Sequence, residues 1–119
     1  MDLFDPTQLG LAAALRGSAA QQTAIAQNLA NANTPGYRRV SVDFQSQLQS
    51  LMAAGDRKGL QAFTPQMTVD NAAPVRADGS TVDVEKEAAA QASNGMTYQA
   101  IAQVMAARID IIGSALGVK

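Results

Sequence analysis

The sequence predicts a mostly α-helical protein in which an N-terminal and a C-terminal helix pair as an antiparallel coiled coil. The chain has 119 residues, enough for one compact domain, and both ends carry apolar residues at helical spacing. Thirteen of the nineteen charged residues fall between positions 38 and 87, so two nearly uncharged ends flank a charged middle. We expect one domain, with a short middle helix and a long, partly irregular loop that has a possible small β element.

The N-terminal helix is expected over residues 7–33. Asp5 is suited to cap the first turn, and Pro6 fits the first helical position because its fixed φ matches a helix. Two rows then recur at the alternating four- and three-residue spacing of a helix that packs against another helix. These rows are Leu11, Ser18, Ile25 and Ala32, and Leu15, Gln22 and Leu29.

The middle of the chain, residues 34–80, begins with a turn. Pro35 followed by Gly36 is typical of a type II turn, in which the Gly takes a positive φ. Alternating apolar residues predict an extended segment to about residue 42, followed by a short helix to about Ala54. Residues 55–80 contain two Pro and three Gly and predict a long loop, with a short β element at about 66–69. Arg38 and Arg39 are interpreted as a solvated exit from the turn.

The C-terminal helix is expected over residues 81–117, starting at Thr81 or Asp83. Asp83, Glu85 and Glu87 are interpreted as acids that favour a helix N-terminus. One apolar row contains Tyr98, Ala102, Met105, Ile109, Ile112 and Leu116, and a second contains Ile101, Val104, Ile111, Ala115 and Val118, interrupted by Arg108. Asn94-Gly95 is a turn signal, so we expect a kink there, or a helix that is continuous only when packed.

The composition excludes several chemistries. The chain has no Cys and no His, so thiolate or imidazole catalysis, Cys-ligated metals and disulfides are ruled out. We expect neither an enzyme nor a cofactor or metal site. A net charge of −1 gives no electrostatic basis for nucleic-acid binding. We also expect no membrane span. We expect no cleaved signal peptide, because Asp2 and Asp5 stand where the basic region of such a peptide would lie.

The two apolar rows of the C-terminal helix predict neighbours on two sides. Pairing with the N-terminal helix would cover one row and leave the other as a partner site. The residues expected to pack or assemble are Leu11, Leu15, Ile25, Leu29, Tyr98, Ile101, Val104, Met105, Ile109, Ile111, Ile112 and Leu116. This pattern favours a self-assembling helical subunit. A helical adaptor or secretion chaperone that binds a partner helix, and a small coiled-coil regulator, remain as alternatives.

Two motifs carry a resemblance. The run Asn28-Leu29-Ala30-Asn31-Ala32-Asn33-Thr34-Pro35-Gly36-Tyr37 is similar to the signature N-[IL]-A-N-x-x-T-P-G-Y of bacterial flagellar axial proteins, the rod, hook and hook-associated families. Val82, Asp83, Glu87, Asn94, Tyr98 and Gln99 resemble the V-D-x-x-x-E…N-x-x-x-Y-Q pattern of the same families. The short length resembles the proximal-rod members, because hook and distal-rod proteins carry inserted β domains.

The resemblance implies a structural role in the basal-body rod, the drive shaft that crosses the periplasm. It implies export through the flagellar type III apparatus without a cleaved signal. The implied partners are copies of the chain itself, other rod proteins, the adaptor FliE and components of the export gate and MS ring. In this scheme, the Tyr98–Leu116 row binds the N-terminal helix and the Ile101–Val118 row meets adjacent subunits.

Overall fold

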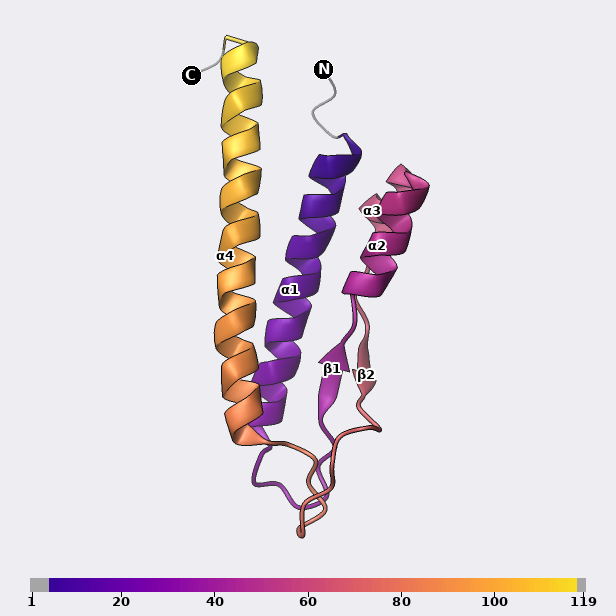
Figure 1. The fold of residues 1–119 in the computed structure, drawn as a ribbon, viewed down its shortest axis with the longest axis vertical. Coiled ribbons are helices and arrows are strands. Elements are labelled where there is room, and N and C mark those ends of the chain that lie inside the picture. The colour runs from indigo at the N-terminus through magenta and orange to yellow at the C-terminus, as the bar shows by residue number, and fades with distance from the viewer. Residues whose placement is uncertain (1–4, 118–119) are drawn as a thin grey trace.

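A computed structural model, which describes residues 5–117, has two long helices that run antiparallel (Figure 1). The elements follow in the order α1 (Pro6–Ala30), β1 (Val40–Val42), α2 (Gln45–Ala54), α3 (Arg57–Ala62), β2 (Met67–Val69) and α4 (Val84–Ala115). The molecule measures 61 × 28 × 15 Å along its principal axes. α1 lies in the middle, with α4 on one side and the smaller elements on the other (Figure 1). The mostly α-helical class predicted from the sequence is confirmed.

The ends of α1 follow local chemistry. The Asp5 carboxylate accepts a hydrogen bond from the Gln8 N–H at 2.8 Å, as expected of an N-cap. The helix ends at Ala30, short of the predicted residue 33, because the chain already turns at Asn31. A tight turn follows, in which Gly36 has a φ of +74° and the Tyr37 N–H donates to the Thr34 carbonyl at 3.1 Å.

The main hydrophobic core lies between α1 and the middle of the chain. It consists of Leu9, Ala13, Ala24, Val42, Phe44, Leu60 and Phe63. Small residues of α1 allow close contact on this side. A Cβ atom at Gly17 would lie 2.3 Å from the Phe44 ring, so this ring packs directly on the helix backbone. The sequence indicated the other face of α1 only.

Residues 57–62 form α3, which corrects the prediction of an irregular loop at this point. Asp56 caps the helix by accepting from the Gly59 N–H at 2.8 Å. Leu60 is fully buried. The Arg16 guanidinium donates to the Leu60 carbonyl at 2.8 Å and to the Phe63 carbonyl at 3.3 Å, which fixes the end of α3 against α1.

The two strands form an antiparallel pair. Val40 lies opposite Val69 and Val42 lies opposite Met67. The β element predicted at about 66–69 is therefore present as β2. Pairing with β2 fixes the path of β1, which runs back along α1 after the turn.

α4 is continuous through Asn94 and Gly95, where a kink was one expectation. Asp83 caps its start by accepting from the Glu85 and Lys86 N–H groups at 3.1 and 3.3 Å. No helix within residues 5–117 combines the length and hydropathy needed to cross a bilayer. Val118, predicted for the second apolar row, lies outside the described residues.

The buried and half-buried row of α4 combines residues of both predicted rows with three polar residues that bind α1. Its members are Glu87, Asn94, Ile101, Met105, Arg108 and Ile112. Tyr98, Ile109 and Leu116 instead lie on one flank of this row, 41%, 53% and 64% exposed. Val104 and Ile111 lie on the other flank, 48% and 65% exposed. Within the predicted Tyr98–Leu116 row, Ile112 is buried and Met105 half-buried, whereas Tyr98, Ile109 and Leu116 keep much of their surface exposed. The binding of this whole row to the N-terminal helix therefore stays a prediction.

Candidate functional site

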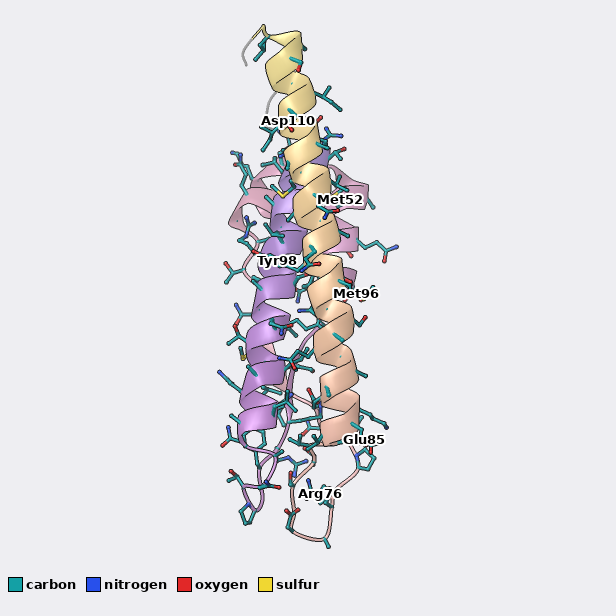
Figure 2. All side chains as sticks on the ribbon, turned by 90° about the vertical axis from the view of Figure 1, so that its left-hand side faces the viewer. Met52, Arg76, Glu85, Met96, Tyr98 and Asp110 are labelled. Carbon is teal, nitrogen blue, oxygen red and sulfur yellow. The ribbon has the colours of Figure 1, made fainter. Side chains whose placement is uncertain are left out.

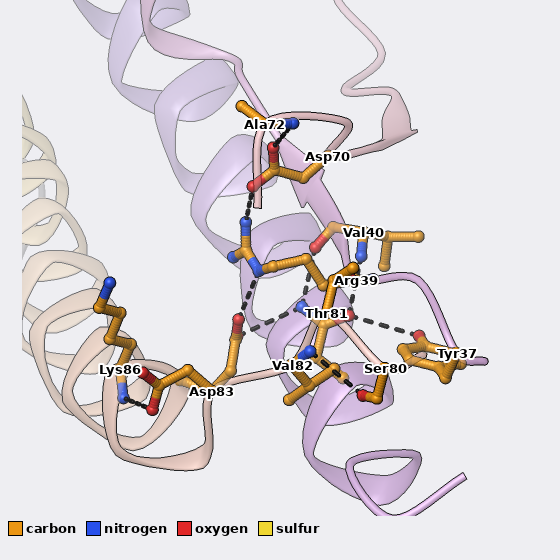
Figure 3. A network of polar contacts seen from close by, with 12 residues as sticks. Tyr37, Arg39, Val40, Asp70, Ala72, Ser80, Thr81, Val82, Asp83 and Lys86 are labelled. Carbon is orange, nitrogen blue, oxygen red and sulfur yellow. Dashed lines mark hydrogen bonds and ion pairs between the residues drawn. The ribbon is translucent and has the colours of Figure 1, made fainter. Parts of the chain in front are cut away.

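The two sequence motifs meet where the end of α1, the start of β1 and the start of α4 come together. Asn28, fully buried, lies at the centre of this contact. Its Oδ1 accepts from the Val40 N–H at 2.8 Å and the Tyr37 hydroxyl at 3.3 Å. Its Nδ2 donates to the Val40 carbonyl at 2.8 Å and to Glu87 Oε2 at 3.2 Å. Asn28 thus uses all four of its hydrogen-bonding positions. Figure 3 shows the surrounding network, in which Arg39 lies close to Asp70 and Thr81.

Glu87 is a buried carboxylate held from two sides. Its side chain is 2% exposed, and Oε1 accepts from Arg39 Nε at 2.7 Å, in addition to the bond from Asn28. Arg39 also pairs with Asp70 through Nη1. A buried charge is tolerated when it is paired and hydrogen-bonded on its remaining atoms.

The ion pairs also affect the ionisation of their members. Burial opposes the charge on Arg39, but its hydrogen bonds to Glu87 and Asp70 raise the pKa of the guanidinium above its usual value. The hydrogen bond from Arg39 and a second one from the Ala72 N–H lower the pKa of Asp70. Both shifts favour the charged forms, so the network is held together at neutral pH.

The loop before α4 completes the arrangement. Thr81 accepts from the Arg39 N–H through Oγ1 at 2.7 Å and donates its own N–H to the Tyr37 carbonyl at 3.0 Å. The Gly36 N–H donates to the Asp78 carbonyl at 3.0 Å. A Cβ atom at Gly79 would lie 3.2 Å from Gly36 Cα, so two glycines allow the loops to cross closely. We use the name polar junction for Asn28, Tyr37, Arg39, Asp70, Thr81 and Glu87.

Two more polar bridges link α4 to α1 farther along the helices. Asn94 Nδ2 donates to the Ser18 carbonyl and to Gln22 Oε1, both at 2.9 Å. Arg108 donates to Gln8 Oε1 at 3.2 Å and to Asp5 Oδ2 at 2.9 Å. With Glu87, these residues recur at multiples of seven along α4. Polar residues at such positions fix the register of paired helices at a cost in stability.

The other predicted motif residues play smaller roles. Asn33, Thr34 and Pro35 lie in the exposed turn, and Val82 is fully buried next to the polar junction. Asn31 donates from Nδ2 to the Gln27 carbonyl at 2.9 Å, and Gln99 is exposed on α4. Of the predicted packing residues of α1, Ile25 is buried, whereas Leu11, Leu15 and Leu29 are half-buried.

Several residues of the site were not singled out correctly from the sequence. Arg39 was interpreted as solvated and Glu87 as a helix-start acid, yet they pair with each other. Asp70 and Thr81 come from the segment predicted as a loop and from the boundary of α4. One signal was available: Glu87 is a charged residue inside a motif, directly before the twenty uncharged residues 88–107.

The polar side chains of this site hold segments of the chain in position. A cleft of about 780 Å³ opens beside Arg39, Asp70 and Glu87, but their charged groups already bind one another. Among residues 5–117, no group of three or more His, Cys, Asp or Glu side chains is placed to hold a metal ion. The polar junction fixes where the chain leaves α1 and where α4 begins.

Comparison of the sequence with known proteins indicates one family. A family model described as "Flagella basal body rod protein" matches residues 11–38, which include most of α1 and the turn. The Escherichia coli (strain K12) flagellar basal body rod protein FlgB is 34% identical over 105 residues, covering 72% of this chain and 75% of the relative. The FlgB protein of Yersinia ruckeri is 29% identical over 114 residues, covering 81% and 82%. That of Borreliella burgdorferi is 26% identical over 104 residues, covering 72% and 77%. The chain therefore belongs to the FlgB family of flagellar basal body rod proteins.

Proposed function

We propose that this chain is a non-enzymatic building block that enters the rod by burying the flanks of α4 against neighbouring subunits. Its family makes it a structural subunit of the flagellar basal body rod. The proposal beyond this concerns how the subunit assembles, where it acts and which proteins it meets.

The exposed apolar side chains of α4 carry the proposal. Tyr98, Val104, Ile109, Ile111 and Leu116 are all more than two-fifths exposed, although residues of this kind are usually buried. No charged residue occurs between Ala88 and Ala107 to keep this helix in contact with water. Burying a half-exposed Val, Leu or Ile side chain contributes about 1 kcal/mol. Several such residues on one helix therefore favour assembly.

Family membership supports a proposal for the location and the partners. We infer that the chain acts in the periplasmic part of the basal body, in the proximal rod, and that it is exported without a cleaved signal peptide. Its partners would be copies of itself, other rod proteins, the adaptor FliE and components of the export gate and MS ring. Recovery of the protein with purified basal bodies tests the proposed location.

Substitution of Ile111 by Asp tests the role of the α4 flank. Ile111 is 65% exposed, so a charge there is expected to leave the fold of the subunit intact but to disfavour burial against a neighbour. We expect cells that carry Ile111→Asp as their only copy to lose swimming motility and to lack the protein in purified basal bodies. Gln103→Asp, on the outer face of α4, is the matched control and is expected to retain both.

Cell fractionation separates this proposal from the chaperone alternative. A rod subunit is expected in basal bodies and to depend on a working flagellar export system for leaving the cytoplasm. A protein that stays in the cytoplasm while other rod proteins are exported normally would contradict the proposal and favour a chaperone.

A further inference from the structure

We propose that a groove between α1, α2 and α4 receives the Tyr98–Ile109–Leu116 flank of α4 from a second copy of this chain. The inference rests on the proposed function and adds the two surfaces through which copies contact each other. We call the first surface the apolar groove, lined by Leu11, Ala14, Leu48, Met52, Thr97 and Ile101 among others. The second surface, the α4 ridge, consists of Tyr98, Ile109 and Leu116.

The apolar groove is uncharged throughout. It has a volume of about 550 Å³, and all of its lining residues are uncharged, most of them apolar. Met52 on its rim is 40% exposed. Its floor is shaped by Gly10, where a Cβ atom would lie 2.2 Å from Met52 Sδ. A concave surface of this kind binds an apolar ridge and excludes a charged one, because a buried charge without a partner is costly.

The α4 ridge has the matching chemistry, and its C-terminal part has the matching length. Tyr98, Ile109 and Leu116 share one flank of the helix, and they are large and at least 41% exposed. The charged neighbours of the ridge are turned away from it: Arg108 binds Asp5 and Gln8 on α1, and Asp110 is exposed on the outer face. The whole ridge from Tyr98 to Leu116 extends about 27 Å, and its C-terminal part from Ile109 to Leu116 extends about 10 Å, as does the groove wall from Thr7 to Ala14.

The two surfaces lie on opposite flanks of α4. In Figure 2, which looks onto the outer face of α4, Met52 lies on one side of the helix and Tyr98 on the other. Two different, complementary surfaces that face opposite ways make a head-to-tail contact, and repetition of such a contact gives a ring or a helical assembly. A copy bound through its ridge leaves its own groove free for the next copy. This geometry is the reason for assigning the groove to a second copy.

Cysteine cross-linking in basal bodies tests the contact, and the chain has no native Cys to interfere. Cells would express the full-length double variant Met52→Cys/Ile109→Cys as their only copy, and basal bodies would be oxidised briefly before non-reducing electrophoresis. We expect a band at twice the mass of the chain. The matched control Met52→Cys/Gln103→Cys places the second cysteine on the outer face of α4, and at least tenfold less of this band is expected.

The outcomes separate this inference from the proposed function. Double variants that are recovered in basal bodies at the normal level but form no such band would overturn the groove contact and leave the rod role intact. A product with the mass of one copy plus a different rod protein would also overturn it, since the groove would then hold another occupant. Absence of the unmodified chain from basal bodies would overturn the rod role itself.

A charge introduced into the apolar groove gives a second, independent test of the contact. Thr97 lies on the α4 wall of the groove and is exposed in the subunit, so Thr97→Lys is expected to fold normally, as measured by circular dichroism. We expect at least tenfold less Thr97→Lys than Gln103→Lys in basal bodies. Equal incorporation of the two variants would contradict the proposed contact.

Discussion

Replacement of Asn28 by Ala removes the central residue of the polar junction, and we expect it to lower the free energy of unfolding by about 4 kcal/mol. The substitution leaves the Val40 peptide group without its side-chain partner and takes one of two hydrogen-bond donors from the buried Glu87. Each buried polar group left unpaired costs about 1–3 kcal/mol, and more when the group is charged. A loss of this size is a large fraction of the 5–15 kcal/mol that holds a typical domain folded.

Urea unfolding followed by circular dichroism at 222 nm measures this effect. The matched control is Asn33→Ala, which changes an exposed residue of the same motif and is expected to cost less than about 0.5 kcal/mol. Thermal unfolding is expected to show a midpoint about 15 °C lower for Asn28→Ala than for the unmodified chain. Equal unfolding midpoints for the two variants would refute the reasoning, because they would mean that the polar junction contributes nothing to the fold.

Three further substitutions test other contacts. Gly17→Ala is expected to destabilise the protein by about 1–2 kcal/mol in thermal unfolding, because the clash with the Phe44 ring outweighs the gain in helix propensity. A variant more stable than the unmodified chain would contradict the packing of Phe44 on α1. Asp70→Asn is expected to reduce acid sensitivity. The pKa of Asp70 is lower in the folded state, so the stabilising contribution of Asp70 is full above its ordinary pKa of about 4 and is lost as pH falls through the folded-state pKa. Unfolding free energies that change identically between pH 7 and pH 3 in Asp70→Asn and in the unmodified chain would argue against the ion pair. Arg16→Leu is expected to speed hydrogen exchange in α3 about tenfold through loss of the bonds to the Leu60 and Phe63 carbonyls. Unchanged exchange would count against that anchor.

Local signals in the sequence predict the two long helices and their connections well. Asp5 and Pro6 mark the start of α1 because capping depends on residues next to the helix end. Pro35 and Gly36 predict the turn for the same reason: the required φ values are properties of these two residues. Where a structural feature depends on residues that are close in sequence, one sequence contains enough information to predict it.

The register of α4 on α1 was not predictable in the same way. The usual rule places apolar residues at a helix contact, but Asn94 and Arg108 lie in this one because distant partners on α1 satisfy them. Which neighbouring row faces α1 is therefore decided by polar contacts between residues more than 70 positions apart. The apolar rows on either side were recognised, but their partners were not.

The pairing of Arg39 with Glu87 was missed for a similar reason, since 48 residues separate them. The residues next to Arg39 do not distinguish a buried ion pair from a solvated charge. For Glu87, the available signal was its position directly before twenty uncharged residues, and this signal does not name its partner. The missed helix α3 is a different case, because the sequence contained a local signal for it. Gly55 ends α2 with a positive φ and Asp56 immediately caps the next helix, a stop followed by a start within what otherwise resembles a loop.

The central place of α1 has a mechanical consequence. Among the described elements, α4 packs against α1 alone, whereas α1 contacts every other helix and strand. A force applied at the C-terminus would peel α4 away one bridge after another and leave the remaining elements on α1. A force applied at the N-terminus would withdraw α1 itself, so every other element would lose its contact with α1 as this helix is drawn out.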